Sequence, residues 1–162
     1  RMSSIVTGLQ ILKSKFRRVF FTVGNDEMRV TSHEYPDSIA KMLAIFAACD
    51  EIGVDVGGAA VSDSLYIVPL LSWYTAEFDW TDPRPDPDLQ VDTMCRWPLD
   101  AHDQVWKYMM KMNEHQAQEE LWHYAESASV FTFSHFLPRQ DLPFHTMMEI
   151  GMKVMKCVGC QY

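Results

Sequence analysis

The run at residues 65–71, Leu-Tyr-Ile-Val-Pro-Leu-Leu, constrains the fold more than any other segment of this chain. Apolar side chains occupy odd and even positions alike, so a strand there needs cover on both of its faces. Pro69 has no backbone N–H and therefore requires a bulge or the end of the strand nearby. Residues 58–62 precede this run, and Ser62-Asp63-Ser64 is typical of a hairpin turn. We predict strands at 58–62 and 65–71, with the second inside a sheet.

Helical periodicity appears on both sides of these strands. Apolar residues recur at spacings of three and four over residues 3–15 and about 37–52, which predicts two amphipathic helices. Gly53 is typical of the residue that ends such a helix. Two further helices are predicted at about 101–126, where Met and Trp indicate core packing, and at about 143–156.

Short β-branched and aromatic runs at 19–23 and 129–133 predict two more buried strands. Prolines alternate with charged residues at 82–88, and proline neither donates to a ladder nor fits inside a helix. We interpret residues 80–98 as a surface insertion for that reason. The alternation of helices and strands predicts an α/β (α+β) fold in a single domain, 1–162, with helices over the faces of its sheet.

Composition narrows the possible partners of the chain. The formal net charge of −8 argues against a broad nucleic-acid surface, and the basic cluster at 13–18 is typical of a solvated helix end. We find no membrane segment and no secretory leader in the sequence. Dispersed cysteines fit a reducing compartment, so we expect a cytoplasmic protein unless an upstream targeting segment exists. Because the chain opens on Arg1 and closes on Gly-Cys-Gln-Tyr, we expect an internal piece of a longer protein.

Polar residues that could carry chemistry follow two of the predicted strands. Gly24-Asn25-Asp26-Glu27 comes after 19–23, and Ser134-His135 comes after 129–133. Proteins with alternating helices and strands bind ligands at such strand ends. Amide oxygens, carboxylates and imidazoles are ligands of divalent cations, and two cations about 3.5–4 Å apart can activate water and clamp a phosphoryl group. From spacing alone, a plain turn at residue 25 and a structural role for residue 135 remain alternatives.

Several segments, taken in order, resemble one known family. They are residues 16–25, 65–74, 78–79, 95–98 and 132–139, the last reading Thr-Phe-Ser-His-Phe-Leu-Pro-Arg. Together they look like a eukaryotic subgroup of the calcineurin-like metallophosphoesterases, found in plants and protists, over nearly the whole chain. The first segment resembles the approach to that family's Gly-Asn-His-Asp/Glu motif. The resemblance implies a four-layer αββα sandwich of the metallo-dependent phosphatase type, incomplete at both ends of this chain.

The resemblance also implies an activity, which is hydrolysis of a phosphate mono- or diester by metal-activated water. It implies that Asn25 and His135 bind one of two divalent metal ions, which are Mn, Fe, Zn or Mg in such proteins. Asp26 stands at the position of the family's catalytic His. Arg139 could hold a phosphate oxygen of the substrate, with a surface ion pair as the alternative. The family's other ligand motifs would lie outside this chain, so we expect the isolated chain to be inactive.

Asp26 is the point at which the chain departs from the family pattern. A carboxylate beside a phosphoryl group repels it unless the carboxylate is protonated or bound to metal. We therefore expect Asp26 to slow phosphoester hydrolysis. The alternative function is that of a catalytically degenerate family member, which keeps the fold as a binding or scaffold module.

Overall fold

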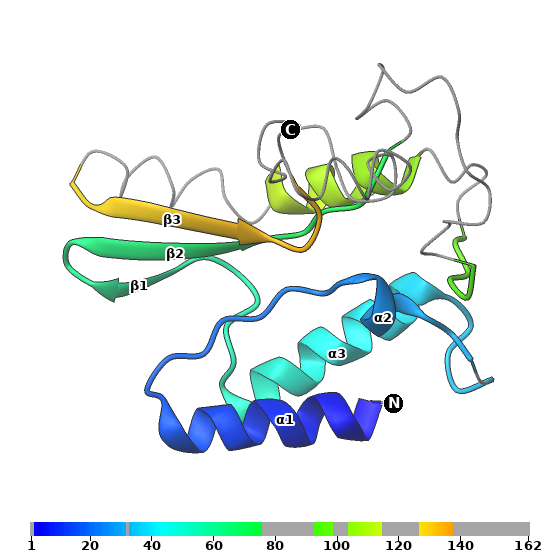
Figure 1. Ribbon diagram of the computed structural model, residues 1–162, viewed down its shortest axis with the longest axis horizontal. Helices are drawn as coiled ribbons and strands as arrows, with labels where there is room; N and C mark the ends of the chain where they lie inside the picture. Colours follow the sequence, from blue (N-terminus) through cyan, green and yellow to red (C-terminus); the bar gives the residue numbers. More distant parts are fainter. Residues whose placement is uncertain (1, 32, 76–92, 99–103, 115–126, 138–162) are drawn as a thin grey trace, which may run out of the picture.

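A computed structural model of the chain describes residues 2–31, 33–75, 93–98, 104–114 and 127–137. Its elements, in chain order, are α1 (Met2–Lys15), α2 (Asn25–Met28), α3 (Ser38–Ile52), β1 (Ala59–Ser62), β2 (Leu65–Leu70) and β3 (Ser129–Ser134). Residues 105–114 form a further helix. Helices α1 and α3 pack side by side, and α2 packs against α3 (Figure 1). The described part of the chain is therefore a mixture of helices and a small sheet, as the α+β prediction states.

The sheet has the order β1-β2-β3, so the run that begins at Leu65 lies between two neighbours. β1 and β2 form the predicted antiparallel hairpin, whose register shifts between Ala60 and Ser62. β2 and β3 run parallel, and their pairing ends at Leu70 and Ser134. β2 stops one residue after Pro69, in agreement with the limit that proline sets. Because the two strands are parallel, their carboxyl ends lie at the same edge of the sheet.

The predicted strand at 19–23 was wrong as a regular element. The segment is extended but makes only an isolated parallel bridge, between Phe20 and Asp55. Phe21 N donates to Asp55 O at 2.9 Å, and Asp55 N donates to Val19 O at 2.8 Å. A ladder needs a partner of several extended residues, and the partner here is a short connection that follows the end of α3 at Gly53. Val19 and Val23 are nonetheless buried in the core, although the segment forms no regular strand.

The other predicted elements within the described residues are confirmed. The two amphipathic helices are α1 and α3, and Asp37 caps α3 by accepting a hydrogen bond from Ala40 N at 2.7 Å. Gly53 ends α3 in the left-handed conformation at φ 72°. Strand β3 matches the prediction at 129–133. The helix predicted at 101–126 is present at 105–114; its remainder, the helix at 143–156 and most of the insertion at 80–98 lie outside the described residues.

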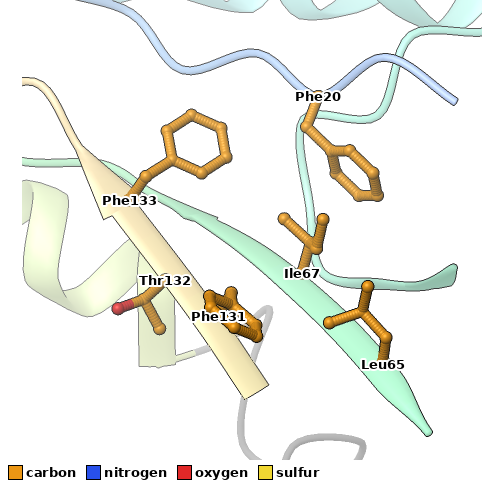
Figure 2. A pocket seen from close by; sticks show the side chains of 6 residues that line it. All are labelled: Phe20, Leu65, Ile67, Phe131, Thr132 and Phe133. Atoms are coloured by element: carbon orange, nitrogen blue, oxygen red, sulfur yellow. The ribbon is translucent and has the colours of Figure 1, made fainter. Parts of the chain in front are cut away.

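One face of the sheet carries an open cavity. Tyr66 and Val68 of β2 are buried on one side, whereas Leu65 and Ile67 point to the other side. There they line an open cavity of about 440 Å³ with Phe20, Phe131, Thr132 and Phe133 (Figure 2). Phe131 remains 61% exposed, so the described residues do not cover this face as the run at 65–71 predicts.

The core lies between the helices and the carboxyl ends of the strands. Trp73, just after β2, is 2% exposed and forms its centre. The rings of Trp73 and Trp97 make a T-shaped contact at 4.9 Å between centroids, and the ring of Phe136 lies 5.2 Å from that of Trp73. Met28 of α2 and Phe136, just beyond β3, belong to the same cluster, so one core fixes both segments that carry the predicted site residues. Among the described residues, no helix has both the length and the apolar content needed to cross a membrane.

Candidate functional site

The structure brings together two residues that the sequence analysis selected as metal ligands. The Nε2 atom of His135 lies 2.8 Å from Oδ1 of Asn25, although the two residues are 110 positions apart in the chain. Asn25 is the first residue of α2, and His135 directly follows β3. The pair therefore lies where β3 leaves the sheet.

Helix α2 is short, and its own contacts hold Asn25 in place. Glu27 Oε2 accepts a hydrogen bond from Gly24 N at 2.9 Å, which is the reciprocal half of a capping box. At the other end of α2, Met28 is fully buried, and its carbonyl accepts a hydrogen bond from Ser38 Oγ at 2.7 Å. These contacts tie α2 to the first residue of α3. Asn25 thus stands on a fixed turn of helix and not on a plain turn.

Gly24 supplies space for the imidazole. Its backbone is extended, at φ −114°, which residues with a side chain also adopt. A Cβ at this position would, however, lie 2.6 Å from both Cε1 and Nδ1 of His135. Glycine is required here by the close approach of the ring and not by the backbone angle.

The backbone next to His135 is anchored in the core. Phe136 is 3% exposed, and its N–H donates to Ser72 Oγ at 3.0 Å. Ser134 Oγ donates to the carbonyl of Phe136 at 2.8 Å. The imidazole meets the ring of Phe136 edge to face, at 4.9 Å and 84°. His135 itself is exposed to solvent, so it combines a fixed backbone with an accessible ring.

Asp26, the third predicted site residue, faces Arg29. Arg29 Nη2 lies 2.8 Å from Asp26 Oδ1, one helical turn away. The same oxygen accepts a hydrogen bond from Asn25 Nδ2 at 3.3 Å. The Asp26 side chain is 70% exposed. Arg139, the predicted substrate-binding residue, lies outside the described residues.

The sequence analysis missed Lys41, a buried cation beneath α2. Its side chain is only 8% exposed, and its Nζ donates a hydrogen bond to the carbonyl of Arg29. Burial lowers the pKa of Lys41, and the nearby groups Cys95, Glu27 and Glu34 oppose that change. Lys41 lies on the buried face of α3, four positions before the buried residue Ile45, and the apolar periodicity of the sequence did not mark that face.

The Asn25 and His135 atoms fit two adjacent positions around one divalent cation. An octahedral cation that binds each donor at about 2.1 Å separates them by about 3 Å, close to the spacing observed here. An amide oxygen with an imidazole nitrogen is also a donor set that such cations accept. Within the described residues, no group of three or more His, Cys, Asp and Glu side chains is arranged to hold a metal ion. Among the described residues, Asn25 and His135 are therefore two donors that could hold a cation, and they do not make a complete ligand set.

The apolar cavity on the sheet is chemically different from this pair. Its lining is aliphatic and aromatic apart from Thr132, so it offers no charged group to a cation or a phosphate (Figure 2). The polar residues that the sequence analysis selected, Asn25, Asp26 and His135, thus lie at the end of β3 and not in this cavity. Comparison of the chain with protein-family models, curated proteins and solved structures gives no match.

Proposed function

We propose that the chain is part of a calcineurin-like metallophosphoesterase domain that hydrolyses a phosphate mono- or diester with two divalent cations. The observation that supports this proposal is the 2.8 Å contact between Asn25 Oδ1 and His135 Nε2. The resemblance assigns these two residues to one cation without reference to their distance, and 110 positions separate them. In this proposal the three-stranded sheet, with α1 and α3, belongs to a four-layer αββα sandwich.

Each residue at the end of β3 has a separate task in the proposed site. Asn25 and His135 would hold one cation, and Gly24 leaves room for the imidazole beside Asn25. Phe136 fixes the backbone from which His135 projects. When bound, divalent cations supply a Lewis acid for the phosphoryl oxygens and lower the pKa of water. Two protein donors do not make a two-metal site, so we expect no measurable turnover from this chain alone.

Manganese titration of the chain tests the proposal. Mn²⁺ broadens NMR signals of nuclei close to it, so we expect the Asn25 side-chain amide and the His135 ring to lose intensity first. His135→Ala should weaken that binding by about tenfold or more, because one of two protein ligands is removed. His33→Ala is the matched control, since His33 is an exposed histidine of the described region that the resemblance does not assign to the site. Broadening spread over exposed carboxylates, with no change in His135→Ala, would reject the proposal.

A catalytically degenerate binding module is the second candidate, and Asp26 favours it. This residue places an exposed carboxylate where the resemblance has a histidine. Asp26→His in the full-length protein separates the two candidates. If the site is catalytic, the histidine restores a proton donor and should raise phosphomonoester turnover by about tenfold or more. Unchanged turnover, with Mn²⁺ binding retained, would favour the binding module.

A further inference from the structure

A continuous set of polar contacts links the candidate imidazole to a guanidinium. His135 Nε2 contacts Asn25 Oδ1 at 2.8 Å, and the other edge of the same amide, Nδ2, contacts Asp26 Oδ1 at 3.3 Å. Arg29 Nη2 holds that carboxylate oxygen at 2.8 Å. The amide of Asn25 therefore lies between an imidazole on one edge and a carboxylate on the other.

The groups beside this amide differ in whether they donate or accept hydrogen bonds. A neutral imidazole either donates or accepts at Nε2, so His135 alone would tolerate either edge of the Asn25 amide. An ionised carboxylate only accepts, so Asp26 selects the NH₂ edge. Arg29 only donates, and its guanidinium holds the Asp26 carboxylate oxygen at 2.8 Å. With the NH₂ edge turned toward Asp26, the amide oxygen is left facing His135.

We infer that Asp26, held by Arg29, is a positioning residue that orients the Asn25 amide so that its oxygen faces His135. The oxygen is the edge of an asparagine that divalent cations bind, so this orientation presents the amide ligand before a cation arrives. A cation that binds Nε2 of His135 would take the place of the proton there, which would move to Nδ1. This consequence for cations rests on the function proposed above, whereas the orientation itself does not. It gives Asp26 a task other than proton transfer.

The contribution of these contacts to folding should be small. The side chains of Arg29 and Asp26 are 42% and 70% exposed, and ion pairs at such positions contribute little to stability. Removing Asp26 should consequently change the orientation of the amide without unfolding α2, whose capping contact comes from Glu27. The two effects can therefore be measured separately.

The test is ¹⁵N NMR of the metal-free chain at about pH 8, above the ordinary titration range of imidazole. In the wild type, His135 should be mainly the tautomer with the proton on Nε2, which donates to Asn25 Oδ1. In Asp26→Ala, the two tautomers should become comparably populated, and the two Asn25 amide protons should move toward free-amide shifts. Asp26→Asn keeps an acceptor oxygen and should retain most of the wild-type pattern. Asp63→Ala removes an exposed carboxylate from the hairpin turn and should change nothing.

A second variant and a second readout decide the remaining outcomes. Arg29→Gln should shift the tautomer ratio in the same direction as Asp26→Ala, by a smaller amount. Unchanged His135 and Asn25 signals in a folded Asp26→Ala chain would overturn the inference. Mn²⁺ affinity should fall roughly tenfold in Asp26→Ala, as is usual when a residue that orients a ligand is lost. If the wild type fails to bind Mn²⁺, the proposed function fails, while the tautomer ratio still decides the role of Asp26.

Discussion

The imidazole of His135 lies so close to Gly24 that a Cβ on this glycine would stand 2.6 Å from two ring atoms. Real Cβ atoms do not approach other atoms to that distance, so a side chain at position 24 and the present position of the ring are incompatible. Since His135 is exposed, its ring can escape by rotating into solvent. The cost of a larger residue should therefore appear in the site more than in the fold.

For Gly24→Ala we predict loss of the contact between His135 and Asn25. The free energy of unfolding should change by less than about 1 kcal/mol, because alanine tolerates the backbone angle and the ring leaves without opening a core cavity. Mn²⁺ affinity should fall by about tenfold or more, as for removal of a ligand. Chemical denaturation and Mn²⁺ titration, each measured on both proteins, check the two parts.

Gly57→Ala is the matched control for this substitution. A Cβ at Gly57 would meet no atom within 4 Å, so it should alter neither Mn²⁺ affinity nor the His135 signals. If Gly24→Ala behaves like Gly57→Ala in the metal titration, the close packing of the ring on Gly24 has no part in the site.

The periodicity of the sequence predicted which segments form helices and strands, but it did not predict what those segments pack against. Helix α3 shows both results. Its bounds and its end at Gly53 follow from the sequence. Its buried face does not, because Leu43, which continues the apolar pattern, is 50% exposed, whereas the polar Ser38 is fully buried. Ser38 is buried because it bonds to the carbonyl of Met28, a contact that periodicity does not encode.

The candidate site shows the same limit. Short helix α2 was not predicted, although the glutamate three positions after Gly24 is a capping signal that could have revealed it. The run that begins at Val19 looked like a strand because β-branched and aromatic residues fill it, but the sequence alone does not say whether a partner strand exists. The contact between Asn25 and His135 spans 110 positions, so local pattern could mark each residue but could not join them. The family resemblance paired them, and the tertiary structure supplies the distance.

Asn113 provides a prediction about what fixes the end of β2. Its side chain is buried and bonds to both backbone groups of Leu71: Oδ1 accepts from the N–H at 2.9 Å, and Nδ2 donates to the carbonyl at 2.7 Å. Asn113→Ala removes both partners inside the protein, where each lost bond costs about 1–3 kcal/mol. We expect a loss of about 2–6 kcal/mol in the free energy of unfolding, measured by urea denaturation.

Asn113→Asp separates the two bonds. The aspartate keeps an acceptor for the N–H of Leu71 but has no donor for its carbonyl. Asn113→Leu, of similar size and without either group, should be as destabilising as the alanine variant. If the leucine variant were as stable as the wild type, burial at this position would depend on volume and not on the paired hydrogen bonds.

Lys41 gives a prediction about pH. Burial lowers its pKa in the folded chain below the ordinary value of 10.5. In the window between the lowered value and 10.5, the unfolded chain binds more protons than the folded chain, so Lys41 makes stability rise with pH there. Below that window, the folded protein keeps a buried ammonium group whose desolvation is offset in part by its bond to the carbonyl of Arg29.

Lys41→Met tests this linkage, because methionine keeps the length of the side chain and removes the charge. A direct pH series on the wild type would mix two effects, since burial also raises the pKa of Cys49 from 9.0 to about 11. Stability due to the buried Cys49 thiol is present below 9.0 and is lost as the pH rises toward 11, opposite in sign to the effect of Lys41.

The quantity to measure is therefore the difference in unfolding free energy between wild type and Lys41→Met, by urea denaturation at several values from about pH 8 to 10.5. We expect this difference to shift in favour of the wild type as the pH rises, because deprotonation relieves the cost of burying its charge. A difference that is independent of pH, with both proteins folded throughout, would mean that the amine of Lys41 reaches water in solution.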